Sequence, residues 1–280
     1  MILPRTSQNS AAVADHYDEL DPVYRRLWGE HVHHGLWRTG RESPEDAVEA
    51  LSDLVGARLG FGRGDRLVDI GCGYGATARR FAGPGTGRGA IVTGFTLSAE
   101  QVGQAPAAGG VTLVCRDWLD NGLAAASADG AYSIESSEHM TDKPRFFAEA
   151  WRVLKPGGRL VVCAWLAKEA PSAWEVRHLL EPICREGSLP SMGSETEYRA
   201  MAQGAGFVCA GFEDVSRSVA RTWSICLGRL VRGVATDRDL RRLVFGARNR
   251  LFALSVPRLM LAYRTGAMRY GVFTFEKGAA

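Results

Sequence analysis

A glycine-rich turn between an apolar run and a helix is the strongest chemical signal in the sequence. Residues 68–75 read Val-Asp-Ile-Gly-Cys-Gly-Tyr-Gly, so Gly71, Gly73 and Gly75 alternate with other residues. Glycine is needed where the backbone takes a positive φ or where a ligand approaches the main chain closely. The spacing differs from the G-x-G-x-x-G of dinucleotide sites, and Asp69 would repel a diphosphate but suit an ammonium group. We therefore expect a nucleoside-type ligand with an amino-acid end, the alternative being a structural glycine turn.

A second group of candidate residues follows the fourth expected strand. Residues 133–139 read Ser-Ile-Glu-Ser-Ser-Glu-His, and in an open α/β sheet ligands lie beyond the carboxyl ends of the strands. His139 can accept a hydroxyl proton near pH 7, and Glu138, if partly buried, could stabilise a developing positive charge. We expect catalysis from Glu138 or His139. The alternative is that they cap the helix that follows.

A cluster of histidines near the N-terminus, His31, His33 and His34, invites a metal interpretation. No carboxylate or cysteine is placed as an obvious further ligand, and the six cysteines are not paired at metal spacing. We expect no metal site and no disulfide, with cysteines that are buried and reduced.

Alternating strands and helices must position these residues. Short apolar runs, typical of strands buried on both faces, occur at residues 66–70, 90–95, 111–115, 130–134 and 159–165. Helices are expected at residues 11–28, at residues 43–59 and from Thr141 or Asp142 to residue 154. The alternation predicts an α/β fold with a Rossmann-like, doubly wound, mostly parallel sheet.

The later part of the chain completes this sheet and adds helices. A capping box, Ser194-x-x-Glu197, opens a helix that ends near residue 205, and residues 206–212 and 268–275 supply two further strands, making seven. Residues 218–263 are mostly helical and suggest a lid, with plain packing against the sheet as the alternative. The chain then divides into an N-terminal helical cap (1–60), a ligand-binding core (61–170) and a last region (171–280) that carries the lid.

Composition narrows the classes of function. The chain has 280 residues and is 46% hydrophobic, enough for one or two domains. Its net charge of +3 is too small, and its basic residues too scattered, to indicate a nucleic-acid partner. No apolar run reaches the roughly 18 residues that span a bilayer, and residues 1–12 do not resemble a signal peptide. We expect a cytoplasmic protein with no integral membrane contact. A homo-oligomer is possible, because the sequence does not determine the oligomeric state.

Several of these motifs resemble the class I S-adenosylmethionine-dependent methyltransferases. Residues 68–75 are similar to their motif I, and residues 129–165, with Leu-Lys-Pro-Gly-Gly at 154–158, to their later motifs. More narrowly, the chain resembles γ-tocopherol methyltransferases and their bacterial natural-product relatives at residues 29–35, 94–98, 135–140 and 266–270. The chain resembles cyclopropane-fatty-acid and sterol methyltransferases slightly less closely. The resemblance covers residues 17–277 and is more specific for the cofactor than for the acceptor.

The resemblance implies S-adenosylmethionine as the cofactor and suggests where it lies. Gly71 and Gly73 would contact its amino-acid end, with Asp69 nearby. Thr96 stands where many methyltransferases have a ribose-binding acid, and Gln101, five residues later, would hold the ribose unless it is merely a solvated polar residue.

Further cofactor contacts are implied in the same way. Asp117 would accept a hydrogen bond from the adenine, and Trp118 would cover the ring or else belong to the core. Ile134 would pack on the cofactor, and Tyr17 and His33 would fold over it as part of the lid.

The predicted function is methyl transfer, at oxygen or carbon, to a small and largely apolar acceptor such as a prenylated phenol, a polyketide or a terpenoid. Large apolar residues of the expected lid, including Trp223, Leu227 and Tyr263, suit such an acceptor. The same stretch holds Arg229, Arg232, Arg238, Arg241, Arg242, Arg248 and Arg250, which either meet a diphosphate or form a solvated helix face. The alternatives are C-methylation of an isoprenyl chain or isoprenyl diphosphate, a cyclisation without methyl transfer, and an NAD-dependent oxidoreductase.

Overall fold

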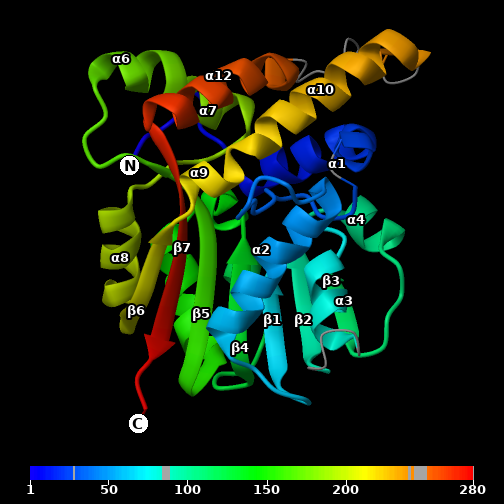
Figure 1. Ribbon diagram of the computed structural model, residues 1–280. Coiled ribbons are helices and arrows are strands. Elements are labelled where there is room, and N and C mark those ends of the chain that lie inside the picture. Colours follow the sequence, from blue (N-terminus) through cyan, green and yellow to red (C-terminus); the bar gives the residue numbers. More distant parts are fainter. Residues whose placement is uncertain (28, 84–88, 239–240, 243–250, 280) are drawn as a thin grey trace.

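Seven strands form one sheet in the order β3-β2-β1-β4-β5-β7-β6 (Figure 1). The strands are β1 (Arg66–Ile70), β2 (Ile91–Thr96), β3 (Val111–Cys115), β4 (Ala128–Ile134), β5 (Leu154–Ala167), β6 (Phe207–Asp214) and β7 (Met268–Lys277). All neighbouring strands pair in parallel except β7, which is antiparallel to both β5 and β6. The computed structural model describes residues 1–27, 29–83, 89–238, 241–242 and 251–279. The predicted Rossmann-like, mostly parallel seven-stranded sheet is confirmed.

Helices cover both faces of the sheet because its strands are apolar on both sides. On one face, α2 (Pro44–Leu59) and α3 (Ala76–Ala82) bury Leu51, Val55 and Phe81 against the strands. On the other face, α5 (Lys143–Val153) and α8 (Glu195–Gly204) bury Phe146, Phe147 and other apolar side chains. The short helix α4 (Ala99–Gln104) follows β2, and single 3-10 turns follow β3 (Trp118–Asp120) and β4 (Ser137–His139). The runs of buried strand residues are what doubly covered parallel sheets require.

Caps fix where the helices begin. The side chain of Ser43 accepts a hydrogen bond from the backbone N–H of Asp46 at 3.0 Å, and the side chain of Asp142 accepts one from Arg145 at 2.9 Å. Ser194 and Glu197 form the predicted capping box at the start of α8. The choice between Thr141 and Asp142 is therefore settled in favour of Asp142.

A third layer of helices lies over the carboxyl ends of the strands. It consists of α1 (Ser10–Leu27), α6 (Ala173–Glu175), the π-helical turn η4 (Val176–Leu180), α7 (Glu181–Glu186), α9 (Ser216–Val219), α10 (Arg221–Thr236) and α12 (Leu251–Thr265). Leu180, Ile183, Trp223 and Leu259 belong to a separate apolar cluster inside this layer. Within the described residues, no helix is both long enough and apolar enough to cross a bilayer.

Some element boundaries differ from the sequence prediction. β5 begins at Leu154 and so includes the Lys-Pro-Gly-Gly turn, and β7 extends to Lys277. The helices between residues 173 and 186 were not predicted, and they join the expected lid. Trp28, residues 239–240 and residues 243–250, including Arg248 and Arg250, lie outside the described residues. The three-part domain division stays a prediction.

Candidate functional site

The glycine turn after β1 opens onto empty space. Gly71, Gly73 and Gly75 have φ values of 80°, 54° and 72°, a region that favours glycine. A Cβ at Gly71 would lie 2.1 Å from the Cβ of Ser136, so no side chain fits there. A Cβ at Gly73 would meet nothing within 4 Å, so a ligand can approach this backbone from the open side.

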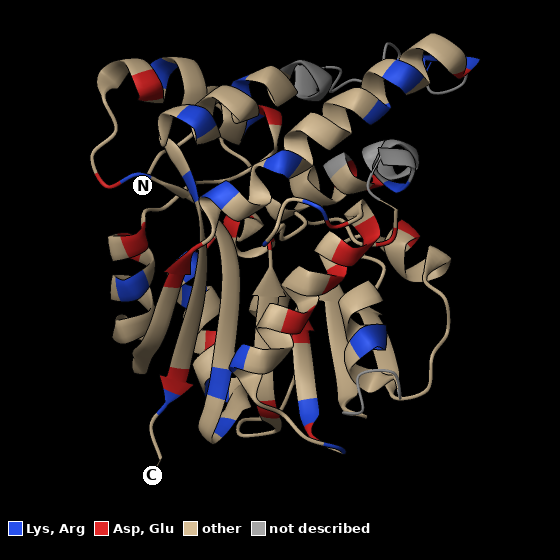
Figure 2. Cartoon of the chain, in the orientation of Figure 1, with Lys and Arg blue, Asp and Glu red and all other residues tan. Residues whose placement is uncertain are grey.

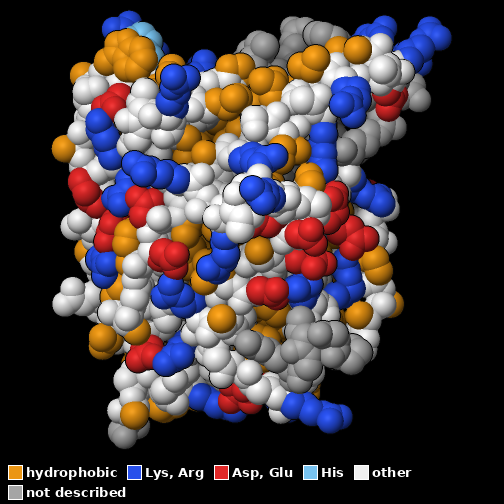
Figure 3. All heavy atoms as spheres, in the orientation of Figure 1, with side chains coloured by type: hydrophobic (Ala, Val, Ile, Leu, Met, Phe, Trp, Pro, Cys, Tyr) orange, Lys and Arg blue, Asp and Glu red, His pale blue; other side chains and the backbone are white. Residues whose placement is uncertain are grey.

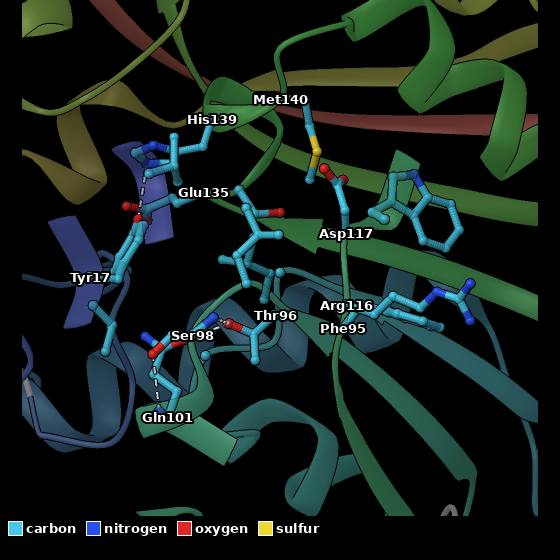
Figure 4. Close-up of a pocket in the computed structure, with 18 residues that line it drawn as sticks. Tyr17, Phe95, Thr96, Ser98, Gln101, Arg116, Asp117, Glu135, His139 and Met140 are labelled. Carbon is cyan, nitrogen blue, oxygen red and sulfur yellow. Dashed lines mark hydrogen bonds between the residues drawn. The ribbon is translucent and has the colours of Figure 1, made fainter. Parts of the chain in front are cut away.

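A first cavity, of about 680 Å³, lies in front of this turn (Figure 4). Its walls include most of the residues expected to hold the cofactor: Tyr17, Gly71, Gly73, Thr96, Gln101, Asp117, Trp118 and Ile134. They come from α1, from α4 and from the ends of β1 to β4 and the turns that follow them. The carboxyl edge of the sheet therefore brings together residues that lie far apart in the sequence.

Polar atoms gather at the end of β2. The hydroxyl of Thr96 donates a hydrogen bond to Oε1 of Gln101 at 2.7 Å, and Ser98 caps α4 by accepting from the N–H of Gln101 at 3.1 Å. Gln101 is only 5% exposed, so it is not a solvated surface residue. With its amide oxygen engaged by Thr96, its amide N–H₂ group is the part of the side chain suited to bind a ligand hydroxyl.

The end of β3 supplies an acid and an aromatic wall. Asp117 accepts hydrogen bonds from the N–H of Leu119 at 2.9 Å and from the hydroxyl of Ser10 at 3.0 Å. Trp118 is both core and cavity wall, because its indole N–H donates to the carbonyl of Phe146 at 3.3 Å and its ring packs edge-on against another aromatic ring.

Asp69 and His33, both expected beside the cofactor, are not on the wall of the first cavity. Asp69 is buried beneath the turn, where it accepts a hydrogen bond from the hydroxyl of Tyr132 at 2.9 Å, and burial raises its pKa to about 7. His33 donates from Nδ1 to the carbonyl of His34 at 2.9 Å and lines a different cavity beside α2 and α10. Contact of either side chain with the cofactor stays a prediction.

A second cavity, of about 520 Å³, adjoins the first. Tyr17, Val32, Glu135 and His139 line both cavities. The remaining walls are largely apolar and aromatic and include Trp165, Leu189 and Trp223. Among the described residues, no lysine or arginine lines the second cavity.

Tyr17 and His139 meet where the two cavities join, and Figure 4 shows them facing each other. Nδ1 of His139 lies 3.4 Å from the carbonyl of Ser188, which can only accept, so Nδ1 carries the proton. Nε2 is then the acceptor for the hydroxyl of Tyr17 at 2.9 Å. Burial lowers the pKa of His139 to about 4, so the ring is neutral at pH 7 and its Nε2 lone pair can accept a hydrogen bond from a hydroxyl group.

Glu138 lies at the second cavity and not at the first. Its carboxylate accepts from the N–H of Trp165 at 2.5 Å and from the hydroxyl of Ser137 at 3.1 Å. Burial, reinforced by the negative charge of Glu135, raises the pKa of Glu138 to about 7. A proton is therefore readily exchanged at this carboxyl near neutral pH.

Glu135 is a central residue of the site that the sequence reasoning missed. Its carboxylate accepts four hydrogen bonds: from N and Nδ1 of His34 at 2.6 and 2.8 Å, from the indole of Trp165 at 3.0 Å and from the hydroxyl of Tyr270 at 2.8 Å. Its backbone φ of 54° is unusual for a residue with a side chain. The donors come from three distant segments, and only its position between Ile134 and the Glu138-His139 pair hinted at a role.

Helix α1 covers the first cavity through contacts at three points. Ser10 binds Asp117, Tyr17 binds His139, and the hydroxyl of Ser98 donates to Asp18.

The described residues contain no group of three His, Cys, Asp or Glu side chains that could hold a metal ion.

Comparisons with known proteins agree with this geometry. A family model described as a methyltransferase domain matches residues 68–162. The chain is 28% identical to the chloroplastic tocopherol O-methyltransferase of Arabidopsis thaliana over 95% of this chain and 81% of that protein. It is 33% identical to the 27-O-demethylrifamycin SV methyltransferase of Amycolatopsis mediterranei, covering 74% of this chain and 78% of the relative. Among solved structures, the cyclase SpnF matches with a TM-score of 0.81 and 26% identity, covering 100% of both chains.

Proposed function

This chain belongs to the S-adenosylmethionine-dependent methyltransferases of small molecules, and we propose that its acceptor is an apolar phenol, methylated on the hydroxyl oxygen. The observation that carries this proposal is the neutral imidazole of His139, whose Nε2 accepts a phenolic hydroxyl, that of Tyr17, where the two cavities join. The Tyr17 hydroxyl marks a position that suits the hydroxyl of an acceptor.

The first cavity fits S-adenosylmethionine. The bare backbone of Gly73 leaves room for its amino-acid end, and Gln101 and Asp117 offer a donor and an acceptor for the ribose and the adenine. Trp118 and Ile134 supply apolar walls for the adenosine. The bound cofactor supplies an activated methyl group, whose carbon–sulfur bond breaks as the bond between that carbon and the acceptor oxygen forms.

The residues of the chain have three tasks in this reaction. His139 accepts the hydroxyl proton of the acceptor at Nε2 while Nδ1–H stays bound to the carbonyl of Ser188. The carboxylate of Glu135 stabilises the imidazolium that results. Trp165 and Trp223 enclose the acceptor and exclude water, which matters because alignment and desolvation supply much of the acceleration.

The lining of the second cavity favours a neutral phenol over an isoprenyl diphosphate. A diphosphate needs cationic donors, and among the described residues no arginine or lysine lines that cavity. Arg229 instead lies near Glu45, and Arg241 donates to backbone carbonyls at the end of α10. The sequence-based alternative of a diphosphate acceptor is therefore less well supported.

A second candidate function is a cyclisation without methyl transfer, supported by the whole-chain similarity to the cyclase SpnF. In that case the two cavities would hold the cofactor and a polyunsaturated substrate, but the cofactor would not be consumed. The aromatic walls of the second cavity would then select the folded conformation of the substrate.

Methyl transfer to a panel of prenylated and polyketide phenols tests the proposal. The wild-type enzyme is expected to yield an O-methyl product and S-adenosylhomocysteine, and His139→Ala to lower kcat about 10²- to 10⁴-fold with little change in cofactor affinity. The matched control is His178→Ala, an exposed histidine on η4 outside both cavities. Methylation only at carbon, or an unchanged kcat in His139→Ala, would contradict the assignment. Product of unchanged mass without S-adenosylhomocysteine would favour the cyclisation.

A further inference from the structure

Two segments of the chain, which supply every helix of the layer over the site except α1, carry an unusual share of the positive charge. Residues 171–187 and 216–266 contain thirteen arginines and no lysine, against five acidic residues, a net charge of +8. The whole chain carries +3, so the remainder carries −5. A charge difference of this size between two parts of one chain indicates an anionic partner for the positive part.

Three of the five acidic residues in these two segments, Glu175, Glu181 and Glu186, are buried. Glu175 pairs with Lys168 at 2.6 Å and Glu186 pairs with Arg258. By contrast, Arg177, Arg232 and Arg264 are exposed, and none forms an ion pair with a carboxylate of the described residues.

Large apolar side chains are exposed on the same helices. Trp174, at the start of α6, is 54% exposed, Val231 on α10 is 61% exposed and Leu261 on α12 is 41% exposed. Figure 3 shows hydrophobic and basic side chains together along the upper edge of the molecule, over α6, α12 and α10, and Figure 2 shows the basic residues on these helices. We call Trp174, Arg177, Val231, Arg232, Leu261 and Arg264 the cap face.

The cap face is the outer side of the layer. Helices α7, η4 and α10 all contact α12, and the side chains between them form the inner apolar cluster that includes Leu180, Trp223 and Leu259. The exposed residues of the cap face lie outside this inner apolar cluster. On the inner side, Trp223 forms part of the second cavity, so one helix, α10, contributes to both surfaces.

We propose that the cap face binds the surface of an anionic lipid bilayer. Guanidinium groups bind lipid phosphates in pairs of hydrogen bonds, and tryptophan prefers the boundary between headgroups and acyl chains. Exposed apolar residues among the arginines favour a lipid surface over nucleic acid, which would be held by charge alone or by stacking. Binding of the cap face to the bilayer does not depend on the proposed function. Only a further step, the passage of the apolar acceptor from the bilayer into the second cavity, rests on that function.

Vesicle flotation of the full chain, without acceptor or cofactor, tests this proposal. The protein is expected to float with phosphatidylcholine vesicles that contain about 30% phosphatidylglycerol, but not with vesicles of phosphatidylcholine alone. High salt is expected to lower the amount of protein that floats with the anionic vesicles about tenfold. Arg232→Glu/Arg264→Glu is expected to lower the partition coefficient about tenfold or more. Trp174→Ala is expected to lower it several-fold without altering the salt dependence.

The matched control is Arg63→Glu/Arg66→Glu, which makes the same charge change at exposed residues beside the start of β1, at the opposite edge of the sheet. This variant is expected to float like the wild type, and thermal unfolding of each variant verifies folding. Absence of binding to anionic vesicles, or equal loss in the two double variants, overturns the proposal. Duplex DNA that binds as tightly as the vesicles, with no effect of Trp174→Ala, would identify a nucleic-acid surface instead. Methyl transfer to a soluble phenol without vesicles tests the proposed function separately.

Discussion

Replacing Glu135 by glutamine tests the buried hydrogen-bond network at the centre of the site. The amide keeps the shape of the side chain but turns an N–H₂ group toward donors from His34, Trp165 or Tyr270. Burial alone would raise the pKa of Glu135, but the nearby His34 lowers it from 4.5 to about 2. At about 1.4 kcal/mol per pH unit this difference corresponds to about 3 kcal/mol. We therefore expect Glu135→Gln to lower the free energy of unfolding by about 3 kcal/mol at pH 7.

The pH dependence of this effect has a definite sign. Because the pKa of Glu135 is lower in the folded state, its stabilisation is complete above the unfolded value of 4.5 and is lost as the pH falls toward 2. Urea denaturation at pH 7 and at pH values between 4.5 and 2 should show the difference between wild type and Glu135→Gln shrinking as the solution becomes acidic.

A matched control for this series is Glu213→Gln, whose half-exposed carboxylate pairs with Arg58 at 2.5 Å. An exposed pair of this kind contributes at most about 1 kcal/mol, so this variant should unfold almost like the wild type. A Glu135→Gln variant as stable as Glu213→Gln, or one whose deficit did not change with pH, would refute the reasoning.

Three further predictions concern the two cavities. Gly71→Ala would place a Cβ 2.1 Å from that of Ser136, so it should abolish cofactor binding in calorimetry or lower the melting temperature; wild-type behaviour in both would contradict the geometry. Asp117→Ala should weaken S-adenosylmethionine binding by about 1–3 kcal/mol if the carboxylate pairs with adenine in a dry pocket, and an unchanged dissociation constant would exclude that contact. The pKa of His139 is about 4, so protonation of its ring should lower kcat only below about pH 5. In a Glu138→Gln variant, which removes the carboxyl that titrates near pH 7, kcat should therefore stay level from pH 6 to 8. An acidic limb near the ordinary histidine value in this variant would show that His139 is not buried as described.

Local patterns in the sequence were sufficient to predict the strands of the sheet. Strands β1 and β4 could be predicted because each is a continuous apolar run. The starts of α2 and α5 could be predicted because their caps, Ser43 and Asp142, are recognised from the residues next to them. The segment from residue 173 to 186 was missed because its three short helical pieces, one of them a π-helical turn, have no sustained 3.6-residue period.

The site was predictable where a motif fixes a residue at a strand end, as for Gly71, Thr96 and Asp117, which all line the first cavity. It was not predictable where long-range contacts decide. His33 lines a different cavity, whose walls include residues of the distant helix α10. The importance of Glu135 depends on donors supplied by residues more than 25 positions away, which no local pattern reveals.

The antiparallel pairing of β6 and β7 has a consequence for how the helices over the site can vary among related chains. Asp214 at the end of β6 pairs with Gly271 near the start of β7, so the long helical insertion leaves and re-enters the sheet at neighbouring points of one edge. The entropic cost of closing such a loop grows slowly with its length. Helices α9 to α12 can therefore be lengthened, shortened or exchanged as a cassette while the sheet and the glycine turn stay as they are. Acceptor preference can then diverge between related chains without a change in the cofactor.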